Sequence, residues 1–332
     1  ENMKKIIITL LLICSIAGAT FAFVGCSPKA DYTVGICQQL EHGSLDKANA
    51  AFRDELTKLM AEKGKTVHFD IKNASNDTAA MTSIANNFVA KNYNLLLGIA
   101  TGAAQQLAGA TQDSKIPVLF TAVTDPVGSN LIGSYTDPAL NGNVTGTSDM
   151  GEMDKQVDLI EKMVGKSGAD LRIGVLYTTN ETNSKVQFAA IKAEAEKRNI
   201  VVVEKGIAEL TEIETAFGGF DGKCDIVYLP TDNKLANAMA TVHTKNKDGA
   251  KLPVVCGAVD MAVDGGTASL GADYVGLGKQ TAKMAFDILF TGKKTTEIQY
   301  EMSKSFELYI NEPFAADINF VIPQAVKDML KK

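Results

Sequence analysis

The stretch LLLGIATGAAQQLAGATQDSKIPVLF, residues 95–120, decides the fold class. It predicts a buried strand at residues 95–100, a short helix at 103–110 and a second apolar strand at 116–120. A strand, a helix and a further buried strand in this order are typical of a right-handed βαβ unit around a parallel sheet. We therefore expect an α/β protein.

The same alternation continues on both sides of this stretch. Before it, strands are predicted at residues 32–37 and 67–71, with helical spacing of apolar residues at 48–60 and 81–89. After a polar, glycine-rich segment at 140–146, the pattern resumes with strands at 172–177, 200–203, 226–229 and 253–256. The tail at 298–308 could return a strand to either half. The chain would then cross more than once between two α/β halves, as a hinged binding protein requires.

Length and charge narrow the class of protein. A chain of 332 residues is too long for one ordinary core and suits two domains. The net charge of −6 argues against nucleic acid as a partner, because phosphate binding needs a basic face. The absence of Trp means that an aromatic pocket would have to rely on Tyr, Phe or the ligand itself.

The N-terminal segment has the layout of a secretory signal. Two lysines, Lys4 and Lys5, precede an apolar run at 6–22, and the signal is expected to cover residues 1–25. Val24-Gly25-Cys26 resembles a bacterial lipobox, which predicts acylation of Cys26 and a lipidated tether at 26–31. An ordinary cleaved signal or an uncleaved anchor are the alternatives. We expect an extracytoplasmic protein that is lipid-anchored to the bacterial cell membrane.

The reactive residue types form no catalytic or metal-binding pattern. Cys37, Cys224 and Cys256 lie in or beside apolar runs without Cys-x-x-Cys spacing, which indicates buried structural thiols. The three histidines are scattered without the spacing of metal ligands. No Gly-x-Ser-x-Gly, Walker or His-Glu-x-x-His motif occurs. We expect neither an enzyme nor a bound metal or cofactor.

Polar loops follow several of the predicted strands, where parallel sheets bind their ligands. Thr101-Gly102-Ala103 opens a helix, so its N–H groups and the Thr101 hydroxyl could hold a carboxylate, although a plain strand-to-helix turn also needs small residues. Asp125, Asp232 or Asp260, in similar loops, could take an ammonium, but Asp232 could equally cap a helix. Such loops suit a zwitterion.

Several short motifs occur in an order that carries a family resemblance. They are Glu41-His42, ATGAAQ (100–105), FTAVTDP (120–126), NVTG (143–146), PTDN (230–233) and LGKQT (277–281). Together they resemble the ABC-transporter substrate-binding family that includes tryptophan- and other aromatic-amino-acid-binding lipoproteins, over residues 32–308. Family members often have proline where this chain has Gly43 and Gly102.

The resemblance implies a two-lobed periplasmic-binding-protein type I fold, in which three crossovers form a hinge between two parallel-sheet α/β sandwiches. It implies a partner permease with a cytoplasmic ATPase, and an aromatic or apolar L-amino acid as ligand; we expect a monomer. Lobe 1 is expected at 32–146 plus about 259–293, and lobe 2 at 147–258 plus about 294–332. The alternative is a sugar- or nucleoside-binding sensor module of the same fold. The implied ligand-binding residues are Glu41, His42, Thr101, Gly102, Ala103, Thr121, Asp125, Asn183, Ser184, Thr231, Asp232, Asn233 and Asp260.

Overall fold

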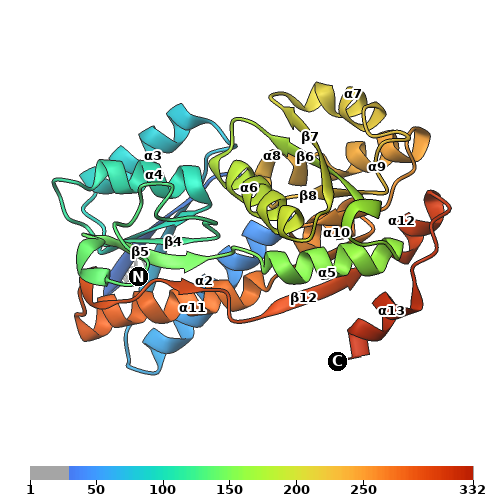
Figure 1. Ribbon diagram of the computed structural model, residues 1–332. Helices are drawn as coiled ribbons and strands as arrows, with labels where there is room; N and C mark the ends of the chain where they lie inside the picture. Colours follow the sequence, from blue (N-terminus) through green and yellow to red (C-terminus); the bar gives the residue numbers. More distant parts are fainter. Residues whose placement is uncertain (1–29, 332) are drawn as a thin grey trace, which may run out of the picture.

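A computed structural model describes residues 30–331 of the chain. The predicted signal at 1–25 and the lipidation site Cys26 lie outside the described residues. Two six-stranded sheets, each flanked by helices, form two lobes that lie side by side (Figure 1). This confirms the expected two-lobed α/β fold.

The first sheet belongs to lobe 1 and has the strand order β11-β5-β4-β3-β1-β2, all parallel. Helices α3 and α4 cover one face, and α2 and α11 pack together on the other (Figure 1). The strands are β1 (Tyr32–Gln38), β2 (Val67–Asn73), β3 (Leu95–Ile99), β4 (Val118–Thr121), β5 (Val144–Ser148) and β11 (Glu301–Met302). The helices are α2 (Gly43–Ala61), α3 (Thr78–Ala90), α4 (Thr101–Ala110) and α11 (Tyr274–Phe286), the last continued by a π-helical turn at Asp287–Thr291.

The second sheet belongs to lobe 2 and has the order β12-β10-β9-β8-β6-β7, with β12 antiparallel to β10. Its strands are β6 (Arg172–Thr178), β7 (Val201–Ile207), β8 (Ile226–Leu229), β9 (Val254–Cys256), β10 (Ala268–Ala272) and β12 (Phe306–Ile310). The helices are α5 (Met153–Val164), α6 (Thr182–Lys197), α7 (Ile213–Gly218), α8 (Asn233–Ala236), α9 (Met239–Asp248), α10 (Val259–Asp264), α12 (Glu312–Asp317) and α13 (Gln324–Lys327). Short 3₁₀ turns occur at Pro138–Leu140, Gly168–Asp170, Leu210–Glu212, Thr295–Glu297 and Asp328–Lys331.

The chain passes between the two sheets three times, after β5, after β10 and after β11. The expected lobe boundaries differ from this arrangement. Residues 259–272, expected in lobe 1, form α10 and β10 of lobe 2, because β10 pairs with β9 and β12. Residues 147–148 and 294–302, expected in lobe 2, lie in lobe 1, since Thr147 and Ser148 pair with β11. The crossovers therefore lie at about 149–152, 273 and 303–305.

The buried cores explain why the apolar runs become strands. Leu97 and Val227, on strands of the two sheets, have no exposed surface and lie in the apolar core. Cys37, Cys224 and Cys256 are free and buried, as the apolar runs around them predict. Burial raises the pKa of Cys37 to about 12, so this thiol is unreactive near neutral pH. Within residues 30–331, no helix has the length and apolar character needed to span a membrane.

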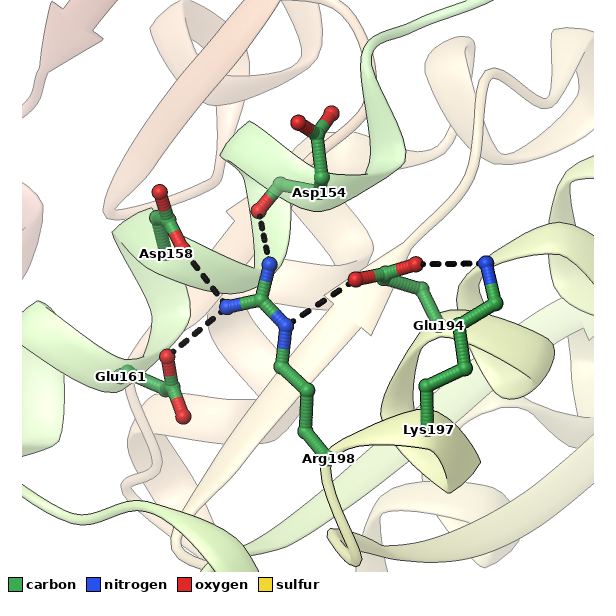
Figure 2. A network of polar contacts seen from close by, with 6 residues as sticks. All are labelled: Asp154, Asp158, Glu161, Glu194, Lys197 and Arg198. Atoms are coloured by element: carbon green, nitrogen blue, oxygen red, sulfur yellow. Dashed lines mark hydrogen bonds and ion pairs between the residues drawn. The ribbon is translucent and has the colours of Figure 1, made fainter.

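A charge cluster joins the first two helices of lobe 2 (Figure 2). Arg198, at the end of α6, donates from Nη1 to Asp158 (2.6 Å) and Glu161 (3.0 Å) of α5. Its Nη2 donates to the Asp154 carbonyl oxygen, and its Nε to Glu194 of its own helix. Because the guanidinium uses three nitrogens in fixed directions, it sets the position of α6 against α5. The opposite end of α6 carries residues of the cleft described next.

Candidate functional site

A cavity of about 400 Å³ lies between the lobes. It is formed mainly where parallel strands end, the position at which open α/β sheets bind ligands. A second cavity of about 470 Å³ adjoins it and shares Asn76 and Lys234. Lobe 1 lines the first cavity with Gln39, Asn76, Thr78, Met81, Thr101, Gly102, Gln105 and Gln106; lobe 2 lines it with Asn180, Glu181, Thr182, Asn183 and Lys234.

The lobe 1 wall is built around the N-terminus of α4. Ala100, between β3 and α4, has φ 73° and ψ 164°, a backbone conformation that costs a non-glycine residue about 1–3 kcal/mol. This bend starts α4 at Thr101, whose hydroxyl is buried and has no hydrogen-bond partner among the described residues. Gln39 accepts the Gly102 N–H at 2.8 Å and donates to Asn76. The Thr101 hydroxyl therefore remains available at a helix end that favours negative charge.

The lobe 2 wall centres on Glu181, which lies in the loop after β6 and directly precedes α6. One carboxylate oxygen accepts from the backbone and side-chain nitrogens of Asn233, both at 2.9 Å, and from Asn183 at 3.3 Å. The other accepts the Lys234 N–H at 3.1 Å. Burial, and secondly the neighbouring Asp232 carboxylate, raise the pKa of Glu181 to about 7. A carboxyl group that titrates near neutrality on a cavity wall is a candidate for ligand contact.

Sequence reasoning missed Glu181, although it selected Asn183 and Ser184 from the same loop. The available signal was an acidic residue between a buried strand and a helix. Its burial depends on Asn233, far away in the sequence, which no local pattern reveals.

Asp232 supports this wall from behind. One oxygen accepts from the Thr178 N–H (2.8 Å), the Thr178 hydroxyl (2.7 Å) and the Ser184 hydroxyl (2.6 Å), and the other from the Leu235 N–H. The Thr231 N–H donates to Gln187. Asp232 is therefore the cap of α8, the second of the two roles that the sequence allowed, and it does not line the cavity.

Two of the implied residues join the lobes without lining either wall of the first cavity. His42 Nε2 lies 3.2 Å from Asn233 Oδ1, and burial lowers the His42 pKa. Asp260 of α10 accepts from Ser44 (2.9 Å) and Lys47 (2.7 Å) of α2. These contacts connect lobe 1 to lobe 2.

The two glycines that depart from the family pattern lie at close approaches. A Cβ atom on Gly43 would lie 2.9 Å from the Asp260 Cγ, and one on Gly102 would lie 2.8 Å from the Gln39 Oε1. Both positions therefore favour a residue without a side chain, since the neighbouring polar groups occupy the space.

The remaining implied residues lie elsewhere. The Thr121 hydroxyl is buried in a chain with Thr147 and Thr281, at 3.0 and 2.8 Å. Asp125 accepts the Gly128 N–H at 2.7 Å and the Tyr135 hydroxyl, so it shapes its own loop. Glu41 lines the second cavity, and Ala103 is buried within α4. Of the implied set, Thr101, Gly102 and Asn183 line the first cavity.

The chain matches known sequences over nearly its whole described length. A family model described as ABC transporter substrate binding protein matches residues 33–331. A tyrosine-binding protein of Clostridioides difficile is 37% identical over 284 residues, which cover 86% of this chain and 80% of that protein.

Solved structures agree with the sequence matches. A domain from Streptococcus pneumoniae in complex with L-Trp is 34% identical, with a TM-score of 0.79 over 89% of this chain and 98% of that one. The ligand-free, open structure of a substrate-binding protein with adhesive properties from Clostridium difficile is also 34% identical. Its TM-score is 0.67, over 88% of this chain and 96% of that one.

Proposed function

This chain belongs to the ABC transporter substrate-binding protein family, and we propose that it captures an aromatic L-amino acid between its lobes. Members of this family are extracytoplasmic binding proteins and not enzymes. We further propose that the loaded protein acts as a monomer, delivering its ligand to a partner permease with a cytoplasmic ATPase. Cleavage of the signal at 1–25 and acylation of Cys26 would keep it at the membrane.

The proposal rests on the cavity between the lobes, where the lobe 1 wall favours a negative group and the lobe 2 wall favours a positive one. The start of α4 and the free Thr101 hydroxyl suit a carboxylate. Glu181 provides negative charge on the facing wall. A zwitterion satisfies both, and the aromatic side chain is proposed from the tyrosine and L-Trp named for the relatives.

Closure of the lobes is the proposed mechanism of capture. Since each lobe supplies half of the walls, the ligand binds best when both halves meet and water is excluded. The contacts of His42 with Asn233 and of Ser44 with Asp260 hold the lobes together here. At equal identity, this structure matches the L-Trp complex better than the open, ligand-free protein, with TM-scores of 0.79 and 0.67. Both observations support a closed arrangement.

A sugar or nucleoside ligand is the second candidate, as for a sensor module of the same fold. Among the described residues that line the cavity, none is aromatic, and Met81 is the one long apolar side chain. Such a polar lining favours a ligand with many hydrogen-bonding groups. The relatives' ligands favour the amino acid.

A thermal-shift screen followed by calorimetry distinguishes the two. The protein from residue 27 onward is tested against amino acids, sugars and nucleosides. A ligand at a hundredfold excess over its Kd adds about 2.7 kcal/mol to the free energy of unfolding. Stabilisation by Tyr, Trp or Phe alone supports aromatic amino-acid binding. Stabilisation only by a sugar or nucleoside overturns the ligand assignment.

A further inference from the structure

We propose that Glu181 receives the ammonium group of the ligand while the Thr101 hydroxyl and the start of α4 receive its carboxylate, so that each charged end contacts a different lobe. This assignment rests on the proposed function and deepens it. It makes Glu181 a specificity-determining residue that selects amino acids over carboxylic acids without an amino group.

The first argument is charge compensation around Glu181. Its donors are the backbone and side-chain nitrogens of Asn233, the Lys234 N–H and the Asn183 amide, all neutral. Within residues 30–331, Glu181 forms no ion pair, and Lys234, whose backbone N–H it accepts, directs its ammonium to the Ala208 carbonyl oxygen. Asp232, beside it, also has only neutral donors. A buried carboxylate without a cation is costly, and a ligand ammonium supplies the missing charge.

The second argument comes from the opposite wall. Thr101 is 4% exposed, lines the same cavity, and its hydroxyl has no hydrogen-bond partner among the described residues. Buried hydroxyls without partners are rare, so this one points to a ligand group. It lies at the first turn of α4, a helix of ten residues, where the helix end stabilises an anion. Gln39 already accepts the Gly102 N–H, which leaves the hydroxyl as the free side-chain contact.

The third argument is that the other acidic residues considered for the ammonium lie outside the first cavity. Asp232 is 1% exposed and does not line it. Asp260 forms an ion pair with Lys47 at 2.7 Å. Asp125 is bound within its own loop. Glu181 is the acidic residue among those that line the first cavity.

The assignment gives the charged groups of the ligand a role in closure. A carboxylate on lobe 1 and an ammonium on lobe 2 are both satisfied only when the lobes meet around the ligand. A carboxylic acid without the amino group would occupy lobe 1 and leave Glu181 without its cation.

The test uses matched ligand pairs and Glu181→Gln. L-Tyrosine is compared with 3-(4-hydroxyphenyl)propanoic acid, and L-tryptophan with indole-3-propanoic acid, by calorimetry at pH 8. The wild-type protein is expected to prefer the amino acid of the pair that it binds. Glu181→Gln is expected to weaken amino-acid binding by about 10- to 100-fold, the range for a charged hydrogen bond, and to change binding of the deamino acid by less than about threefold.

Two control variants separate this role from a structural one. Glu196→Gln, an exposed change on the same helix α6, is expected to alter neither affinity. Thr101→Val is expected to weaken both ligands of a pair, because both carry the carboxylate. Equal weakening of both ligands by Glu181→Gln, or of neither, overturns the assignment alone. If the wild-type protein binds no amino acid, the proposed function fails and this assignment fails with it.

Discussion

Tyr274 donates its hydroxyl to Asp149 Oδ2 over 2.7 Å, and this bond joins two of the three segments that cross between the lobes. Asp149 directly follows β5, and Tyr274 begins α11. The other Asp149 oxygen accepts the Thr124 hydroxyl at 3.0 Å. Burial raises the pKa of both groups above their ordinary values. The hinge therefore contains a buried polar pair that holds the crossovers at a fixed separation.

Tyr274→Phe is expected to lower the free energy of unfolding by about 1–3 kcal/mol, because it leaves a buried Asp149 oxygen without its donor. Urea denaturation measures this loss. Tyr309→Phe on β12 is the control, since Tyr309 is half-buried and its hydroxyl forms no hydrogen bond among the described residues. A change within about 0.5 kcal/mol is expected there. Equal effects of the two variants would contradict a special role for the Tyr274–Asp149 pair.

Arg198→Lys is expected to lower the free energy of unfolding by about 1 kcal/mol, because an ammonium cannot reproduce the contacts that three guanidinium nitrogens make with Asp158, Glu161, Glu194 and the Asp154 carbonyl oxygen. The Arg198 side chain is 24% exposed, which keeps the loss moderate. Lys197→Met, at an ion pair whose lysine is 72% exposed, is expected to change stability by less than about 0.5 kcal/mol. Thermal unfolding compares the two variants. An equal shift in Tm would argue against a role of Arg198 in holding α6 against α5.

The sequence predicted the two sheets well because their buried strands are continuous apolar runs such as residues 95–99. The sequence analysis assigned β10 to the wrong lobe, because a short strand of mostly small residues such as Ala268–Ala272 does not indicate which sheet it joins. The sequence did not reveal Glu181 as a site residue, because its neighbours Asn233 and Lys234 come from the end of another strand. Local patterns reveal strands and caps, whereas tertiary contacts decide which carboxylates become buried.

The affinity for an aromatic amino acid is expected to depend on pH through Glu181. Its pKa is raised to about 7, so the free protein binds a proton there below neutrality. The ammonium needs the charged carboxylate, and affinity should therefore fall about tenfold for each pH unit below about 7. Calorimetry from pH 5.5 to 8 measures the slope. The neighbouring ionisable groups are Asp232 and Lys234, with His42 on the facing lobe. Glu181→Gln is expected to give a flat profile, which separates the effect of Glu181 from theirs.

The raised pKa of Glu181 also determines how the stability of the free protein changes with pH. The Glu181 carboxyl has an ordinary pKa of 4.5 and a pKa of about 7 in the folded protein. Because the folded state holds the proton more tightly, the stabilising contribution is complete below about 4.5 and is lost as the pH rises through about 7. A ligand ammonium opposes this loss. Ligand-induced stabilisation, measured as a Tm shift, should therefore be larger at pH 8 than at pH 6, and the reverse order would contradict the role of Glu181.

Asp260→Asn is expected to open the lobes of the free protein. Asp260 receives hydrogen bonds from Ser44 and Lys47 across the interface, and its side chain is 15% exposed, so the change removes an ion pair that is partly shielded from water. Small-angle X-ray scattering should give a larger radius of gyration for the free variant and an unchanged value at saturating ligand. The ligand affinity should fall by about 2- to 10-fold, because the ligand must then supply the closing free energy alone. Lys245→Met removes an ion pair with Glu214 inside lobe 2 and should change neither quantity. A free Asp260→Asn protein as compact as the wild type would mean that the hinge, with its Tyr274–Asp149 pair, sets the closed arrangement without help from α2 and α10.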